Sequence, residues 1–199
     1  MNLELHNKSL LNKNDKVKLY NTWARSYEKY VDSIGYCGPK NVVKYFSKLI
    51  EKSNNKNLNI LDFGCGTGLL GLELKNNIPS LNITGIDISD NMIKKAEKKN
   101  IYKNIFNVNL LNLSDEEIIK KFKKFDYIIS CGVFLEGHVP FSIISKLKLI
   151  VKNNIIFTVR NSYIKENKDD FYTNVISSKS YLEYDISYLD NVSCKLIII

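Results

Sequence analysis

Residues 59–74 read NILDFGCGTGLLGLEL, an apolar run followed by four glycines within eight residues. An apolar run that ends in a glycine-rich turn and continues into a helix-forming stretch predicts a strand, a loop and a helix. Glycines in such a loop let the backbone approach a ligand, and the amides at the start of the helix favour anionic groups. The glycines fit GxGxG over residues 64–68 and GxGxxG over residues 66–71, so the loop alone leaves the nucleotide cofactor open.

The composition is that of an ordinary globular protein. The chain has 199 residues, 44% hydrophobic and 25% charged, so we expect a single domain over residues 1–199 with one substantial core. The formal net charge is +8, and the cations are almost all Lys, with Arg only at Arg25 and Arg160. The Lys residues are spread along expected helices. This favours solvated helix faces over a nucleic-acid site, because few planar Arg groups are left to read phosphates or bases.

Cysteine spacing and the first residues indicate the cellular environment. Cys37, Cys65, Cys131 and Cys194 show no CxxC pairing, which disfavours a zinc site or a disulfide scaffold and suits a reducing compartment. The first residues lack the apolar core of a signal peptide, and no apolar run reaches the ~18 residues of a membrane span. We therefore expect a cytoplasmic protein without a bound metal.

From residue 58 onward, short β-type runs alternate with amphipathic helical stretches. Strands are predicted at 58–63, 82–86, 104–108, 125–131, 155–160, 181–187 and 193–199. Helices are predicted at 69–76, 90–99, 115–123, 141–150 and 168–178. Ser114 and Glu117 form a capping box before the third of these helices. Alternating strands and helices form right-handed crossovers in a parallel sheet, which binds ligands at the carboxyl ends of its strands.

The two ends of the chain depart from this pattern. A short Asp190–Asn191 turn joins the last two strands, so we expect them to be antiparallel. The final strand ends in LIII, and we expect neighbouring strands to cover it, since an exposed apolar edge would aggregate. Residues 15–52 look helical, and their aromatic residues share one face, at Tyr20, Trp23, Tyr27 and Tyr30. That face serves either as core packing or as a lid over the ligand.

Two carboxylates near the loop discriminate between the cofactors. Asp87 ends the second predicted strand, where a carboxylate can accept both hydroxyls of an adenosine ribose. Asp62 lies two residues before Gly64, and an ionised carboxylate there would repel the pyrophosphate of a dinucleotide. S-adenosylmethionine instead brings an ammonium, which needs an acidic or carbonyl acceptor. A dinucleotide fingerprint counted from Gly64 would also need a glycine at the position of Leu69.

Three segments carry a family resemblance: ILDFGCGTGLLGLEL, ITGIDISDNMIKKA and FDYIISCGVFLEGHVP. They resemble the first motif, the second motif and the fourth-strand segment of the class I S-adenosylmethionine-dependent methyltransferases. Within that class the chain is most similar to the methyltransferase-like family named after the Williams-Beuren syndrome chromosome region, through LYNTWARSYEKYV, YCGP, GHVP and FTVRNS. The resemblance covers about residues 17–162. It implies an α/β, Rossmann-like three-layer sandwich, with a seven-stranded, mostly parallel sheet, an antiparallel last strand and an N-terminal helical lid.

The resemblance also implies a set of cofactor-binding residues. They are Tyr20, Trp23, Tyr27, Asp62, Gly64, Cys65, Gly66, Asp87, Ile88, Met92, Asn109, Leu110 and Cys131. In this set the glycine loop would line the methionine part, with Asp62 near the ammonium and Asp87 on the ribose. The residues after the second and third strands would hold the adenine, where Asn109 stands in place of the more usual Asp. The three aromatics match a lid, and core packing explains them equally well.

The resemblance further implies methyl transfer, with S-adenosylhomocysteine as the second product. Transfer from a sulfonium is an in-line displacement, so the enzyme mainly has to align the reacting atoms in a water-poor pocket. If a base is needed, His138 is the first candidate, although it could instead orient its own loop. Glu136 beside it is a second candidate, and its alternative is a solvated side chain. Tyr36, Phe134 and Glu136 are candidates for the acceptor pocket.

The acceptor class is indicated by the end of the fourth strand. SCGV stands there instead of the Asn-Pro-Pro-Tyr type of tetrapeptide found in many enzymes that methylate amino groups of nucleic acids and proteins. A small-molecule acceptor is therefore favoured. Two alternatives stay open: a nicotinamide-dependent oxidoreductase that uses the GxGxxG reading, and a non-catalytic protein that keeps the fold for a partner.

Overall fold

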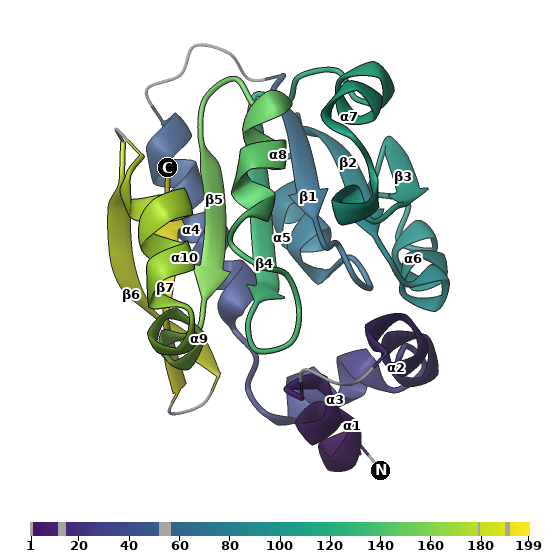
Figure 1. The fold of residues 1–199 in the computed structure, drawn as a ribbon. Helices are drawn as coiled ribbons and strands as arrows, with labels where there is room; N and C mark the ends of the chain where they lie inside the picture. The colour runs from purple at the N-terminus through teal and green to yellow at the C-terminus, as the bar shows by residue number, and fades with distance from the viewer. Residues whose placement is uncertain (1, 12–14, 52–56, 179, 190–191) are drawn as a thin grey trace.

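The computed structural model describes residues 2–11, 15–51, 57–178, 180–189 and 192–199. Within these residues, seven strands form one sheet in the order β3-β2-β1-β4-β5-β7-β6 (Figure 1). The strands are β1 (Asn59–Phe63), β2 (Asn82–Asp87), β3 (Asn104–Asn107), β4 (Tyr127–Phe134), β5 (Ile155–Val159), β6 (Leu182–Leu189) and β7 (Val192–Ile198). The first five are mutually parallel, whereas β7 runs antiparallel to both β5 and β6. The α/β fold and the antiparallel last strand are thereby confirmed.

The strand that carries LIII lies inside the sheet, as expected. β7 pairs with β5 on one side and with β6 on the other, and Leu196 and Ile197 are fully buried. The edge position falls to β6, whose side chains are largely exposed and include Glu183 and Asp185. Charged residues on an edge strand hinder pairing with a second molecule. The predicted Asp190–Asn191 turn lies outside the described residues.

Helices cover both faces of the sheet (Figure 1). One face carries α4 (Gly38–Ile50) and α5 (Leu69–Asn77), and the other carries α7 (Asp115–Lys121), α8 (Ile143–Leu149), α9 (Asn161–Glu166) and α10 (Lys168–Phe171). Each face has its own apolar core, and α6 (Asp90–Glu97) packs beside β2 and β3. This is the expected three-layer arrangement, since an amphipathic helix and a sheet bury their apolar surfaces against each other.

A local sequence signal marks the start of one helix, while the C-terminal helical region departs from its prediction. The capping box of Ser114 and Glu117 is present at the start of α7. The helix predicted over 168–178 is only partly correct: α10 ends at Phe171, and residues 172–176 form a wider π turn, with the Ser177 amide donating to the Tyr172 carbonyl. The short polar helix α9 was not predicted, because its six residues carry no clear apolar period.

Three N-terminal helices lie beyond the carboxyl ends of the parallel strands (Figure 1). They are α1 (Asn2–Ser9), α2 (Lys16–Trp23) and α3 (Tyr27–Ser33), and Trp23, Tyr30 and Val31 form their small separate core. Asn21 fastens α2 to the start of α6, because its side-chain oxygen accepts bonds from Ser89 Oγ at 2.8 Å and the Asn91 amide at 3.0 Å. In the described part of the chain, none of the helices combines the length and apolar character needed to cross a bilayer.

Candidate functional site

The glycine loop between β1 and α5 has a backbone that only glycine adopts easily. Gly64, Gly66 and Gly68 have φ angles of +73°, +53° and +89°. The amides of Gly64 and Cys65 both donate to the Ile86 carbonyl, at 2.9 and 3.0 Å, which folds the loop against the end of β2. A Cβ at Gly64 would lie 2.3 Å from Val133 Cγ2, while one at Gly66 would meet no heavy atom of the described residues within 4 Å. Gly64 is therefore required for packing, and Gly66 leaves open space for a ligand.

Asp87 joins the end of β2 to this loop. Its Oδ2 accepts a hydrogen bond from the Gly66 amide and its Oδ1 accepts one from the Ser89 amide, both at 2.8 Å. Burial raises the pKa of Asp87, and these backbone donors partly offset that rise by favouring the charged form. Each oxygen keeps a further lone pair, so the carboxylate can still accept ligand hydroxyls.

Asp62 lies behind the loop and is 1% exposed. Its Oδ2 accepts a 2.6 Å hydrogen bond from the Tyr102 hydroxyl. The amide of Gly71 also favours its charged form, yet Oδ1 makes no hydrogen bond of standard geometry within the described residues. Burial outweighs these contacts and raises the pKa of Asp62 to about 7. The buried carboxyl therefore titrates well above the ordinary range of an aspartate, which the sequence did not indicate.

Tyr102 was missed by sequence reasoning, and three glycines carried the signal for it. A Cβ at Gly71 would lie 2.3 Å from the Tyr102 hydroxyl, and one at Gly68 or Gly85 would lie 3.1–3.2 Å from the ring. The three glycines thus form a slot for this ring beside the loop. Gly71, whose position created the apparent GxGxxG pattern, serves to admit the tyrosine that binds Asp62.

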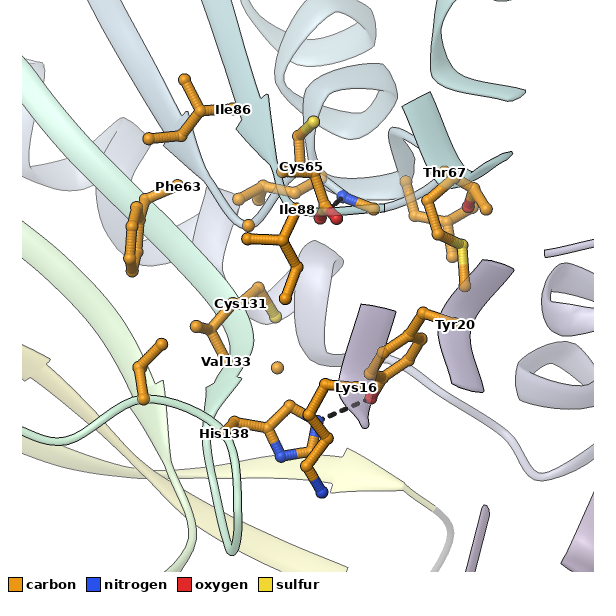
Figure 2. Close-up of a pocket in the computed structure, with 18 of the residues that line it drawn as sticks. Lys16, Tyr20, Phe63, Cys65, Thr67, Ile86, Ile88, Cys131, Val133 and His138 are labelled. Atoms are coloured by element: carbon orange, nitrogen blue, oxygen red, sulfur yellow. Dashed lines mark hydrogen bonds between the residues drawn. The ribbon is translucent and has the colours of Figure 1, made fainter. Parts of the chain in front are cut away.

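A cleft with an empty volume of about 1060 Å³ opens between the loop, the ends of β2 and β4, and the N-terminal helices. Thirteen of the residues predicted for the site line it: Tyr20, Tyr27, Tyr36, Gly64, Cys65, Gly66, Asp87, Ile88, Met92, Asn109, Leu110, Cys131 and His138. The cleft also reaches Lys16, Thr67 and Val133, which were not predicted. Figure 2 shows Tyr20 and His138 on one side of it and Cys65 and Ile88 on the other.

Four predicted residues do not line this cleft. Asp62 lies behind the loop, as described above. Trp23 is 2% exposed and packs edge-on against Tyr27, so its ring belongs to the core of the N-terminal helices. Phe134 is 1% exposed and packs against Phe157 with ring centroids 4.4 Å apart. Both rings pack in the core. For Trp23 this is the alternative to a lid that the sequence left open, whereas Phe134 does not line the cleft as an acceptor-pocket residue would.

Glu136, the fourth, pairs with its neighbours outside the cleft. Its carboxylate accepts from Arg160 Nη1 at 3.3 Å and from the Ser162 hydroxyl. Although burial raises the pKa of Glu136, these contacts outweigh burial, and the pKa lies below its ordinary value. Glu136 therefore remains ionised near neutral pH, and its carboxylate is held by Arg160 and Ser162 outside the cleft.

Neutral polar groups surround the end of the cleft nearest β4. The Tyr36 hydroxyl lies 3.1 Å from Cys131 Sγ, and burial raises the pKa of Cys131 to about 12. His138 Nε2 lies 2.7 Å from the Tyr20 hydroxyl, and its Nδ1 lies 2.8 Å from the Glu136 carbonyl oxygen. Burial, the largest cause, lowers the pKa of His138 to about 4. These groups are uncharged at neutral pH and suit a reaction in which the substrate supplies the charge.

Lys99 ties the loop to the N-terminal helices. Its Nζ donates to the Thr67 carbonyl at 2.7 Å and pairs with Glu28 of α3 at 2.5 Å. In the part of the chain that the structure describes, no group of three His, Cys, Asp or Glu side chains is arranged to hold a metal ion.

The chain is similar in sequence to several known proteins. A family model described as "Methyltransferase domain" matches residues 54–194. A malonyl-[acyl-carrier protein] O-methyltransferase of Bacillus anthracis is 29% identical over 145 residues, which cover 72% of this chain and 48% of that protein. A ubiquinone biosynthesis O-methyltransferase of Pelagibacter ubique is 32% identical over 122 residues, which cover 59% of this chain and 48% of that protein. The chain thus spans about half the length of these relatives.

Solved structures share the fold. A plantazolicin methyltransferase in complex with a pentazolic desmethylPZN analog and S-adenosylhomocysteine superposes with a TM-score of 0.64 at 14% identity, covering 100% of this chain and 99% of that one. A magnesium protoporphyrin IX methyltransferase of Synechocystis with bound S-adenosylmethionine gives a TM-score of 0.56 at 18% identity, covering 98% and 89%. At these identities the similarity supports the fold alone.

Proposed function

The chain belongs to the methyltransferase domain family, and we propose that it transfers a methyl group from S-adenosylmethionine to a small-molecule acceptor. The observation that carries the proposal is the cleft, where a glycine loop, a ribose-type carboxylate and neutral polar groups meet. Family membership favours this activity over a nicotinamide-dependent oxidoreductase. We further infer that the chain acts as one domain in the cytoplasm, without nucleic acid, and that it belongs to the Williams-Beuren-type family indicated by its motifs.

The adenosine half of the cofactor fits the side of the cleft formed by β2 and α6. Asp87 would accept the two ribose hydroxyls. Each of its oxygens already accepts one backbone amide, from Gly66 or Ser89, and keeps a further lone pair for a ligand hydroxyl. Ile88, Met92 and Leu110 line the cleft beside it and offer an apolar wall for the adenine. Asn109 is available for the edge of the base, although its side-chain oxygen already accepts from the Leu111 amide at 3.0 Å.

The methionine half fits the glycine loop. Thr67 lines the cleft, and its buried hydroxyl has no hydrogen-bond partner among the described residues, so it can donate to a carboxylate. Gly66 leaves the space that such a group would fill. Asp62 would act on the ammonium from behind the loop, which stays a prediction because its carboxyl does not line the cleft.

S-adenosylmethionine, when bound, supplies an activated methyl group on a positively charged sulfur. The protein's task is then to hold the acceptor in line and to exclude water. Tyr20, Tyr27 and Tyr36 line the cleft. Asn21 and Lys99 hold α2 and α3, the helices that carry Tyr20 and Tyr27. None of these contacts requires a metal or a second cofactor.

Calorimetric titration tests the cofactor assignment without knowledge of the acceptor. We expect binding of S-adenosylhomocysteine and none of NAD. Replacing Asp87 with Ala removes two hydrogen bonds to a charged acceptor, worth roughly 1.5–3 kcal/mol each, so affinity should fall at least about 100-fold. Asp90→Ala, three residues away on the exposed start of α6, is the matched control and should bind normally. Tight NAD binding with no binding of S-adenosylhomocysteine would overturn the proposal.

A further inference from the structure

A chain of hydrogen bonds crosses the cleft from α2 to the loop after β4. His138 Nδ1 lies 2.8 Å from the Glu136 carbonyl oxygen, and His138 Nε2 lies 2.7 Å from the Tyr20 hydroxyl. Both rings line the cleft, and they meet edge to face with centroids 5.6 Å apart (Figure 2). The Tyr20–His138 pair is therefore positioned to touch whatever occupies this end of the site.

The direction of every bond in this chain follows from its last member. A backbone carbonyl can only accept, so Nδ1 of His138 must carry a proton. In the neutral imidazole Nε2 then carries none, and it accepts the proton of the Tyr20 hydroxyl. The Tyr20 oxygen, having donated its only proton, is left with lone pairs and can only accept from a ligand. The site therefore presents a hydrogen-bond acceptor to the substrate.

Neighbouring groups do not reverse this direction. The Ser9 hydroxyl lies beside Tyr20, but its proton goes to the His6 carbonyl at 2.7 Å. Lys16 lines the cleft near His138, but its Nζ donates to the carbonyls of Ser9 and Leu11 at 2.5 and 2.9 Å.

The charges that face His138 act in opposite directions. Lys16 of α2 and Arg160 after β5 disfavour the imidazolium, whereas Glu136 of its own loop favours it. Burial is the largest influence on the His138 pKa, which falls to about 4. The free ring is thus neutral at physiological pH, which leaves Nε2 able to accept a proton.

We propose that the methyl acceptor presents a protonated hydroxyl, thiol or N–H group to the Tyr20 oxygen, and that Tyr20 passes the acceptor's proton to His138. The proposal rests on the proposed methyl-transfer function and adds the chemical class of the acceptor. A carboxylate is disfavoured, because it carries no proton at neutral pH and its oxygens would face the lone pairs of Tyr20. Tyr20 is then a catalytic residue, and His138 acts through it.

The proton and the electrons balance within one step. The acceptor atom gives its proton to the Tyr20 oxygen, and Tyr20 gives its own proton to His138 Nε2. The acceptor atom forms a bond to the methyl carbon while the carbon–sulfur bond breaks, and that electron pair stays on sulfur. A positive charge leaves the sulfur as one appears on the imidazolium, so the total charge in the cleft is unchanged. His138 then releases the proton to water.

Nitrogen-15 NMR of the histidine rings tests the direction of the chain without any acceptor. The sequence has two histidines, His6 and His138, so the His138→Gln variant assigns the spectrum by the signal it removes. We expect His138 at pH 7 to be neutral with the proton on Nδ1. Tyr20→Phe should shift the Nε2 signal of His138. Tyr30→Phe is the control and should leave that signal unchanged, because Tyr30 lies in the same aromatic cluster but outside the cleft. A proton on Nε2 at pH 7 would overturn the proposal.

A labelling experiment tests the acceptor class. The protein is incubated with methyl-tritiated S-adenosylmethionine and a metabolite extract, and the product is then treated with alkali. Methyl ethers, thioethers and N-methyl groups keep the label, whereas methyl esters of carboxylates release it as volatile methanol. We expect the label to be retained, and label released as methanol would overturn the proposal.

The two variants separate proton transfer from binding. His138→Gln keeps an oxygen that can accept from Tyr20 but cannot take its proton, so S-adenosylhomocysteine should bind as before while labelling falls by roughly 100-fold or more. Tyr20→Phe should lower labelling as much. Labelling at the wild-type rate in either variant would refute the relay. A wild-type protein that labels nothing would count against the proposed function, while the NMR spectrum still decides the direction of the chain.

Discussion

Replacing Asp62 with Asn removes a buried carboxyl whose proton is coupled to folding. Burial raises its pKa from 3.8 to about 7 in the folded protein, while the unfolded chain keeps the lower value. Between these pH values the folded state holds a proton that the unfolded state has lost. The free energy of unfolding contributed by this group is therefore highest below pH 3.8 and falls as pH rises towards 7.

The size of the effect follows from the shift in pKa. Each pH unit in that window is worth ~1.4 kcal/mol, so the whole shift amounts to about 4 kcal/mol, of which about 3 kcal/mol is lost between pH 5 and pH 8. Asn at position 62 can still accept the Tyr102 hydroxyl proton but does not titrate. The stability of Asp62→Asn relative to the wild type should therefore increase by about 3 kcal/mol over this range.

Urea unfolding of both proteins at pH 5, 6, 7 and 8 measures this difference. Groups that titrate without an interaction with Asp62, such as His138, are present in both proteins and cancel. Asp126→Asn is the matched control: burial tends to raise the pKa of Asp126, but bonds from Asn59 and Lys152 outweigh it and the pKa is lowered. Asp126→Asn should therefore change the free energy of unfolding by the same amount at each pH between 5 and 8. Parallel pH profiles for the wild type and Asp62→Asn would refute the reasoning.

Three further predictions concern the glycine loop and its contact with the N-terminal helices. Gly64→Ala should lower the free energy of unfolding in urea by about 2–5 kcal/mol. The change adds left-handed backbone strain of roughly 1–2 kcal/mol and overpacking against Val133 of roughly 1–3 kcal/mol. A second substitution, Val133→Ala, should recover only the overpacking part. Gly66→Ala should cost only the strain, about 1–2 kcal/mol, yet weaken S-adenosylhomocysteine binding in calorimetry, and normal affinity would contradict our placement of the ligand. Lys99→Met should speed amide hydrogen exchange in both residues 66–68 and α3, whereas Glu28→Gln should affect α3 alone; unchanged exchange in the loop would show that Lys99 does not couple the two.

Local patterns of the sequence were sufficient for the sheet. All seven strands lie within a few residues of their predicted positions, because each is a short apolar run bounded by turn-forming residues. The capping box at Ser114 set the start of α7 in the same way. Helices α1 and α9 were missed, because each is short and polar and shows no helical periodicity of apolar residues.

The cofactor loop was also within reach of the sequence. Spacing alone placed Gly64, Gly66 and Asp87 together, because the carboxyl ends of adjacent parallel strands meet at one edge of a sheet. Trp23 and Phe134 were harder, since an aromatic residue at a helical or strand spacing suits a core as well as a pocket. Only their burial distinguishes the two.

The amino-acid sequence by itself determined the positions of the strands, the glycine loop and the family to which the chain belongs. These depend on residues close together in the chain. The tertiary structure decided which distant groups touch: Tyr102 with Asp62 across 40 positions, and Tyr20 with His138 across 118. Such contacts set protonation and hydrogen-bond direction, since burial and partners shift a pKa by several units while the sequence leaves both open. Our proposal that the acceptor carries a removable proton rests on the Tyr20–His138 contact, which no sequence motif indicated.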